Sequence, residues 1–151
     1  MDKSKEIRAK EFESYIMNWY LKEHSISLSH FTTLKEQIHI GENRQGIEIK
    51  NDQKLSTTGN IYISVKRVYD YGKEYPSGIF KNQSWLYVIG DYNMHWVFSI
   101  KHLKQYYTSA NPKLIKGFKT LKDGQEYGFL LNAKNADYIC TEKYSKQTVL
   151  L

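Results

Sequence analysis

The sequence predicts an α/β or α+β domain in which helices flank both faces of one mixed central β-sheet. Three observations carry this prediction: a helical apolar pattern near the N-terminus, and two apolar, β-branched segments at residues 46–68 and 84–100 that each resemble a pair of strands. The chain has 151 residues, of which 40% are hydrophobic and 25% are charged. This composition is typical of a folded soluble protein, and we expect one domain over residues 1–151.

The first predicted element is a helix over residues 5–22. Its apolar residues recur at spacings of three and four, which gives one continuous apolar stripe along the helix. Glu13 lies at the edge of this stripe. A glutamate in such a place is usually solvated, and it becomes a candidate functional residue only where a polar cleft opens beside it. Residues 23–45 are predicted to form a loop with a short strand or helix at 31–40.

Apolar and polar residues alternate along both strands of the segment 46–68, as expected where one face of a sheet meets the core. On the polar side, the first strand carries Glu48 and Lys50, and the second carries Ser64 and Lys66. Turn-forming residues between the strands predict a hairpin, which would place Glu48 beside Ser64 and Lys66. A carboxylate and an ammonium group on one rigid surface form either a functional site or a cross-strand ion pair without a functional role.

The rest of the chain predicts a loop at residues 69–83 and then a second hairpin, with strands at 84–90 and 94–100. Both of these strands are apolar on both faces, so they are expected at the centre of a sheet that is covered on each side. The elements expected after them are a short helix at 101–108, a basic irregular stretch at 113–124, a strand at 125–131, a helix at 133–140 capped by Asn132, and a surface tail.

Charge and cysteine content limit the partners and the compartment. The formal net charge of +6 favours a polyanionic partner such as nucleic acid. The 13 tyrosines do not discriminate, because tyrosine suits half-buried strand surfaces as well as stacking on bases. Cys140 is the single cysteine, so a cysteine-based zinc site or a disulfide framework is excluded and a reducing cytoplasm is expected. No apolar run is long enough to span a bilayer, and the charged N-terminus does not resemble a signal peptide.

Three short pieces, in order, resemble the PD-(D/E)xK nuclease superfamily, whose members have the restriction-endonuclease-like fold. Phe12-Glu13 is similar to the glutamate-bearing first helix of the family. The segment GIEI at 46–49 is similar to its first acidic strand, and ISVKR at 63–67 occupies the place of its E/Q-x-K strand. The likeness covers about the first half of the chain. One departure is that Ser64 stands where the family has Glu or Gln.

The resemblance implies a metal-dependent endonuclease that hydrolyses DNA in a restriction, repair or phage-type system, and a homodimer is compatible with such an activity. It implies Mg²⁺ or Mn²⁺ held by Glu48, with Ser64 as a weak neutral ligand and Glu13 as an outer ligand. It implies that Lys66 positions the attacking water or stabilises negative charge. The basic residues expected to contact the nucleic acid are Lys50, Arg67, Lys73 and Lys81.

Two points stay open at the level of sequence. Ser64 is explained by a shifted metal shell in which Asp52 compensates, by a nuclease-fold module that binds nucleic acid or protein without catalysis, or by a substitution that silences activity. Glu48-x-Lys50 is also an E-x-K triplet, for which Glu42 is the nearest earlier acid. We prefer the Glu48–Lys66 assignment because Lys66 is predicted on the same face of the hairpin.

Overall fold

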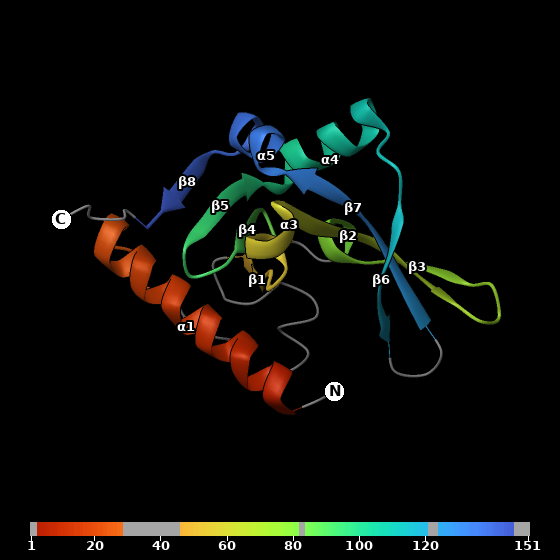
Figure 1. Cartoon of the computed structure of the whole chain (residues 1–151), viewed down its shortest axis with the longest axis horizontal. Coiled ribbons are helices and arrows are strands. Elements are labelled where there is room, and N and C mark those ends of the chain that lie inside the picture. The colour runs from red at the N-terminus through yellow and green to blue at the C-terminus, as the bar shows by residue number, and fades with distance from the viewer. Residues whose placement is uncertain (1–2, 29–45, 82–83, 121–123, 147–151) are drawn as a thin grey trace.

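The computed structural model describes residues 3–28, 46–81, 84–120 and 124–146. Within these residues the chain forms two four-stranded sheets with α-helices packed against them (Figure 1). The α and β content agrees with the predicted class, but the prediction of a single central sheet is wrong. The elements are α1 (Lys3–His24), β1 (Ile47–Asn51), α3 (Leu55–Thr58), β2 (Asn60–Tyr69), β3 (Glu74–Pro76), η1 (Gly78–Phe80), β4 (Leu86–Gly90), β5 (Met94–Ser99), α4 (Ile100–Ala110), β6 (Ile115–Thr120), β7 (Gly124–Asn132), α5 (Ala133–Ile139) and β8 (Glu142–Ser145).

The first sheet has the strand order β1-β4-β5-β8 and lies beside α1. β1 pairs with β4 in parallel, and the other neighbours are antiparallel. The apolar stripe of α1 covers one face of this sheet, because side chains from both are buried together. This cluster consists of Phe12, Ile16, Trp19, Tyr20, Leu28, Ile47, Ile49, Val88 and Val97.

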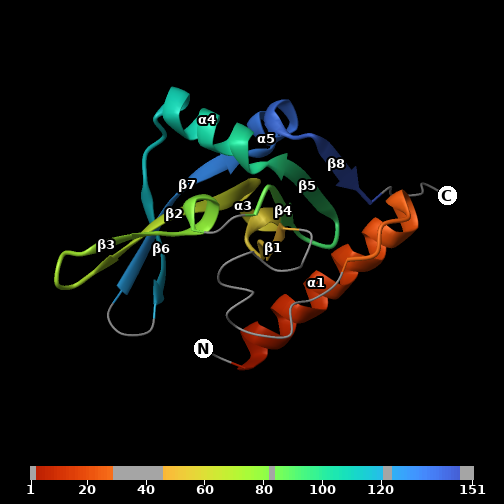
Figure 2. The same ribbon diagram turned by 180° about the vertical axis from the view of Figure 1, so that it is seen from behind.

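The second sheet is antiparallel, with the order β3-β2-β7-β6. Its β2–β3 and β6–β7 ends extend away from α1 and from the body of the molecule (Figures 1 and 2). The register of β2 against β7 shifts between Ser64 and Lys66, which is a β-bulge. Ser64 pairs with Gly128 and Lys66 pairs with Tyr127, so these two residues of β2 lie on opposite faces of the sheet.

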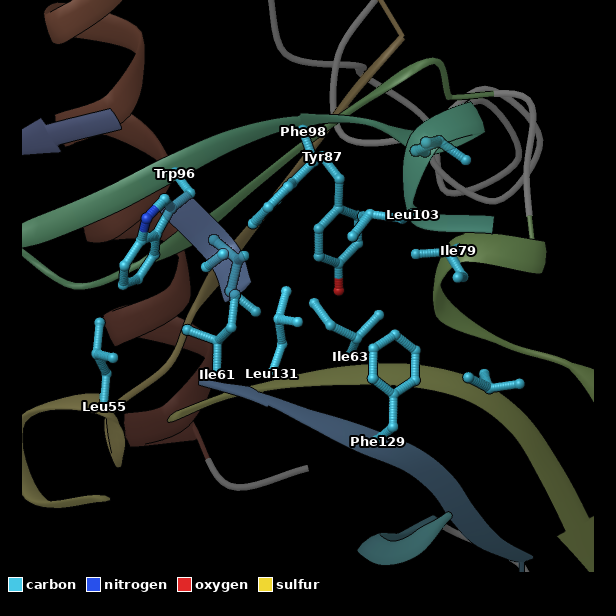
Figure 3. Packing of buried hydrophobic residues seen from close by; sticks show 14 residues of the cluster. Leu55, Ile61, Ile63, Ile79, Tyr87, Trp96, Phe98, Leu103, Phe129 and Leu131 are labelled. Atoms are coloured by element: carbon cyan, nitrogen blue, oxygen red, sulfur yellow. The ribbon is translucent and has the colours of Figure 1, made fainter. Parts of the chain in front are cut away.

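The main core lies between the two sheets and is closed by α4 and α5. Figure 3 shows Tyr87 of β4 pointing toward Ile63 of β2, with Leu103 of α4 beside it. Trp96, Phe98 and Phe129 are fully buried in the same cluster. Each such large apolar side chain contributes roughly 1.5–3 kcal/mol through burial. The core therefore fixes the two sheets face to face.

Several predicted elements are confirmed. The helix at 5–22, the hairpin at 84–100 and the helix at 101–108 correspond to α1, β4–β5 and α4. The strand at 125–131 corresponds to β7. Asn132 caps α5, since its side-chain oxygen accepts a hydrogen bond from the amide of Asn135 at 2.8 Å. β4 and β5 are covered on both faces, as expected, by α1 on one side and the second sheet on the other.

Other predictions are wrong. β1 and β2 do not form a hairpin, because they belong to different sheets. The predicted loop at 69–83 contains β3 and η1, and the basic irregular stretch at 113–124 contains β6. The tail lies at the surface over its described residues, as predicted, and it includes the edge strand β8. The element expected at 31–40 lies outside the described residues. Among the described helices, none combines the length and apolarity needed to cross a membrane.

Candidate functional site

The predicted convergence of Glu48 and Lys66 does not occur through strand pairing. Glu48 is on β1, opposite Tyr87 of β4, whereas Lys66 is on β2, between β3 and β7. Asp52 explains why the chain does not turn back at this point. Its amide donates to the carbonyl of Gly90 at 2.7 Å, while its carboxylate accepts from the amides of Lys54 at 3.0 Å and Tyr62 at 2.8 Å. The chain therefore enters α3 and crosses to the other sheet.

Lys66 is engaged by an acid of the neighbouring strand. Its ammonium lies 3.1 Å from the Oε1 of Glu74, and both side chains are partly exposed. The β-bulge also overturns the predicted face of Lys66, because the extra residue rotates it away from the face that carries Ser64. Ser64 and Lys66 therefore do not form the two ends of one catalytic triplet.

Ser64 makes a buried polar contact beneath the turn that begins η1. Its hydroxyl lies 2.8 Å from the hydroxyl of Ser77, and both residues are buried. A Cβ atom on Gly78 would lie 2.0 Å from the carbonyl oxygen of Ser64, so this turn sits directly on the strand. A glutamate at position 64 would have to displace this contact. The local packing thus accounts for a short neutral side chain where the resembling family has an acid.

Glu48 and Lys50, the alternative triplet, do come together. Their side chains lie on the same face of β1, with the Lys50 ammonium 2.8 Å from the Glu48 carboxylate. The Glu48 side chain is only 9% exposed, so the carboxylate is held in the protein beside a cation. Glu42, the earlier acid considered with this triplet, lies outside the described residues.

The pKa of Tyr87 is affected by the charges of this pair and of two further carboxylates. Its phenol is fully enclosed, and burial raises its pKa far above the usual value; Lys50 opposes that rise, while Glu48, Glu126 and Asp52 add to it. Glu126 is on β7, in the second sheet. Carboxylates from both sheets are therefore within electrostatic range of one buried hydroxyl.

Glu13 does not join Glu48. The face of β1 that packs against α1 carries Ile47 and Ile49, and the alternation of side chains places Glu48 on the opposite face. The helix that carries Glu13 and the carboxylate of Glu48 are therefore on different sides of the first sheet.

The donor set at the predicted position does not fit Mg²⁺ or Mn²⁺. Mg²⁺ and Mn²⁺ prefer several oxygen ligands around one point. Here the Glu48 carboxylate is paired with Lys50 and the Ser64 hydroxyl with Ser77, so their oxygen atoms do not converge on one point. Over the residues that the structure describes, no group of three or more His, Cys, Asp or Glu side chains could hold a metal ion. We therefore assign no step of a reaction to a metal here.

The residues predicted to contact nucleic acid fall on different surfaces. Lys50 neutralises Glu48, and Lys81 is exposed at the end of η1. Arg67 lies on the face of the second sheet that also carries Tyr75 of β3 and Glu126 of β7, its partners across the two neighbouring strands. We call this the outer face, because α4 and α5 pack on the other side, with Phe129 and Leu131.

Three tyrosines gather where the outer face reaches the β2–β3 turn. The rings of Tyr69 and Tyr71 are nearly parallel, at 17°, with centroids 5.5 Å apart. Tyr75 packs edge-on against Tyr69, also at 5.5 Å. The Lys73 ammonium lies 5.3 Å from the centre of the Tyr75 ring. We refer to Tyr69, Tyr71 and Tyr75 as the tyrosine cluster.

The tyrosine cluster is accessible to solvent, and its contacts with Lys73 shift the pKa of the groups involved. Tyr71 is 71% exposed and Tyr75 is 39% exposed. Hydrogen bonding to Lys73, and then to Tyr71, lowers the pKa of Tyr75, and the same contact raises the pKa of Lys73. The sequence places these tyrosines in a predicted loop and does not single them out as functional residues. The signal that could have found them is the Tyr-x-Tyr spacing at the end of a strand, followed by a turn glycine.

No protein-family model, curated protein or solved structure matches this chain.

Proposed function

We propose that this protein is a module that binds nucleic acid through the outer face of its second sheet, around the tyrosine cluster. The observation that carries the proposal is the stack of the exposed Tyr71 on the half-buried Tyr69, with Lys73 held against Tyr75. Aromatic side chains stack on bases, and neighbouring cations attract the phosphates that link them. The net charge of +6 favours the approach of a polyanion to the whole protein.

The placement of the outer face supports the same proposal. Leu130 alternates with the buried Phe129 and Leu131 on β7 and is 46% exposed, so this side of the sheet is open to solvent at that point. Arg67 lies on the same face, but its guanidinium is 4.0 Å from the carboxylate of Glu126, so Lys73 is the cation on which the phosphate contact depends. The β2–β3 hairpin extends from the body, where a long chain can pass without meeting α1 (Figure 2).

Replacing Lys73 tests the phosphate contact. We expect Lys73→Gln to weaken binding of a fluorescently labelled oligonucleotide and to reduce the slope of log affinity against log salt by roughly 0.7–1, the amount expected for one lost phosphate contact. Fluorescence anisotropy at several salt concentrations measures both quantities.

Lys10→Gln is the matched control, because Lys10 is an exposed lysine of α1 and its loss changes the net charge equally. It should leave the salt slope unchanged. Equal effects of the two substitutions would mean that the protein attracts the oligonucleotide by net charge alone, and would contradict a site at the tyrosine cluster. The absence of salt-sensitive binding would refute the proposed function itself.

The endonuclease implied by the family resemblance is a second candidate. It is favoured by the close pair of Glu48 and Lys50, an E-x-K triplet whose carboxylate is almost fully buried. A buried carboxylate beside a lysine is an arrangement found at catalytic sites and also in structural ion pairs. We assign the candidate no catalytic step, because the described donor set does not fit the metal.

A cleavage assay decides this second candidate. If the candidate is correct, labelled DNA should be cut in Mg²⁺ or Mn²⁺, and Glu48→Gln should reduce the rate by about a hundredfold or more while the fold persists by circular dichroism. A rate that is unchanged in Glu48→Gln removes this residue from the mechanism. Intact DNA in both metals rejects the candidate without affecting the binding proposal.

A further inference from the structure

We infer that the tyrosine cluster selects unpaired bases, so that the ligand of the outer face is single-stranded nucleic acid rather than a duplex. This inference rests on the proposed function and specifies its ligand. It starts from the ring geometry: Tyr69 and Tyr71 form an offset parallel pair, and Tyr75 supports Tyr69 from the edge. An unpaired base extends such a stack by placing its own face on an exposed ring.

The exposure of Tyr71 identifies the ring that meets the base. Tyr71 is 71% exposed although it stacks on Tyr69, so most of its surface remains available. In a duplex the faces of the bases are covered by neighbouring base pairs, and a tyrosine ring could reach only their edges. The cluster therefore matches a ligand whose bases are not already stacked in a helix.

The charges near the cluster also favour a single strand. The turn carries Lys73 and also Asp70, and Glu74 at the start of β3 is paired with Lys66 of the adjoining strand. A two-stranded ribbon can enter the major groove of DNA, where it lies between two dense rows of phosphates. Asp70 at the tip would oppose that entry, whereas the charge of Glu74 is balanced by Lys66. Stacking is thus the larger attractive contribution at this place, and phosphate neutralisation is the smaller one.

Three probes of about 12 nucleotides, a length within the range that stacking sites occupy, separate the contributions. They are a labelled oligothymidine strand, an abasic strand of equal length, and a blunt duplex. We expect the wild-type protein to bind the oligothymidine strand roughly tenfold more tightly than either of the other two probes. The abasic strand keeps the phosphates and lacks the bases, so it isolates the contribution of stacking.

Substitutions of Tyr71 complete the test. Tyr71→Ala should weaken binding of the oligothymidine strand about tenfold, to the level of the abasic strand, and leave abasic binding unchanged. Tyr71→Phe should retain the tight binding, because the ring is kept. Tyr138→Ala is the matched control, since Tyr138 lies on α5 and is 92% exposed.

The outcomes distinguish the inference from the proposed function. Equal binding of the three probes, tighter binding of the duplex, or a Tyr71→Ala protein that still prefers oligothymidine would overturn the inference and leave a phosphate-binding surface. The absence of binding to all three probes would overturn both. A preference for oligothymidine that disappears in Tyr71→Ala but persists in Tyr71→Phe and Tyr138→Ala would establish the selection of unpaired bases.

Discussion

Gly78→Ala is expected to destabilise the protein by roughly 3 kcal/mol or more. Gly78 has a φ of +53°, in the left-handed region that costs a residue with a Cβ atom about 1–2 kcal/mol. The added Cβ would also lie 2.0 Å from the carbonyl oxygen and 2.6 Å from the carbonyl carbon of Ser64. Both atoms belong to the backbone of a central strand, so relief requires the turn to move away from β2. Urea denaturation measures the loss as a lower midpoint.

Gly72→Ala separates the two causes. Gly72 has a φ of +84°, but a Cβ atom there would meet no described atom within 4 Å. We expect this variant to lose only about 1–2 kcal/mol, the cost of the left-handed conformation alone. Similar losses in the two variants would show that the contact between Gly78 and Ser64 is not the larger cause.

Acid is expected to weaken the protein through His95. This residue of β5 is completely buried, and neither ring nitrogen has a hydrogen-bond partner among the described residues. It packs against Trp19, with ring centroids 4.6 Å apart, and stacks on Tyr144 at 5.2 Å. Burial lowers the pKa of His95 to about 4, because the charged ring would lose its hydration without gaining a partner.

The direction of the pH effect follows from this lowered pKa. In the unfolded chain the imidazole has its ordinary pKa of about 6.5, so the unfolded state binds a proton first as the pH falls. The contribution of His95 to stability is therefore fully present above about pH 6.5, declines between pH 6.5 and 4, and is lost below that range. The two pKa values correspond to about 3 kcal/mol in total.

Comparison with His95→Phe measures this contribution. Between pH 7.5 and 4.5, the wild-type protein should lose roughly 2–3 kcal/mol more unfolding free energy than the variant. The ring packs against Tyr15 and Tyr144, and these two tyrosines and the His24–Glu142 pair are common to both proteins. His102→Gln, at an exposed site on α4, should follow the wild type. Identical pH profiles for wild type and His95→Phe would contradict a buried neutral imidazole.

The sequence was sufficient for elements that are decided by their own residues. The period of Phe12, Ile16 and Trp19 predicts α1, and the doubly apolar strands predict β4 and β5 at the centre of a sheet. The sequence also predicts the helix cap at Asn132, because this cap needs only a hydrogen bond to the amide of Asn135, three residues further along the chain. Each of these features is local, so competition from distant segments does not change it.

The candidate site could not be predicted in the same way, because it depends on pairing at a distance and on one extra residue. β1 pairs with β4, whose residues lie far along the chain, and nothing in 46–68 indicates that partner. Simple alternation predicted that Ser64 and Lys66 share a face, but the bulge between them reverses the second residue. β3, β6 and β8 are strands at the edges of their sheets, and their polar side chains resemble those of loops.

The parallel pairing of β1 with β4 has a consequence for how the protein is made. β1 leaves the ribosome well before its partner β4. Ile47 and Ile49 therefore have no neighbouring strand to pair with until residues 86–90 have been synthesised. The β4–β5 hairpin is local and is joined by β1 on one side and β8 on the other. The first sheet should then assemble outward from the β4–β5 hairpin, with β1 and β8 added last.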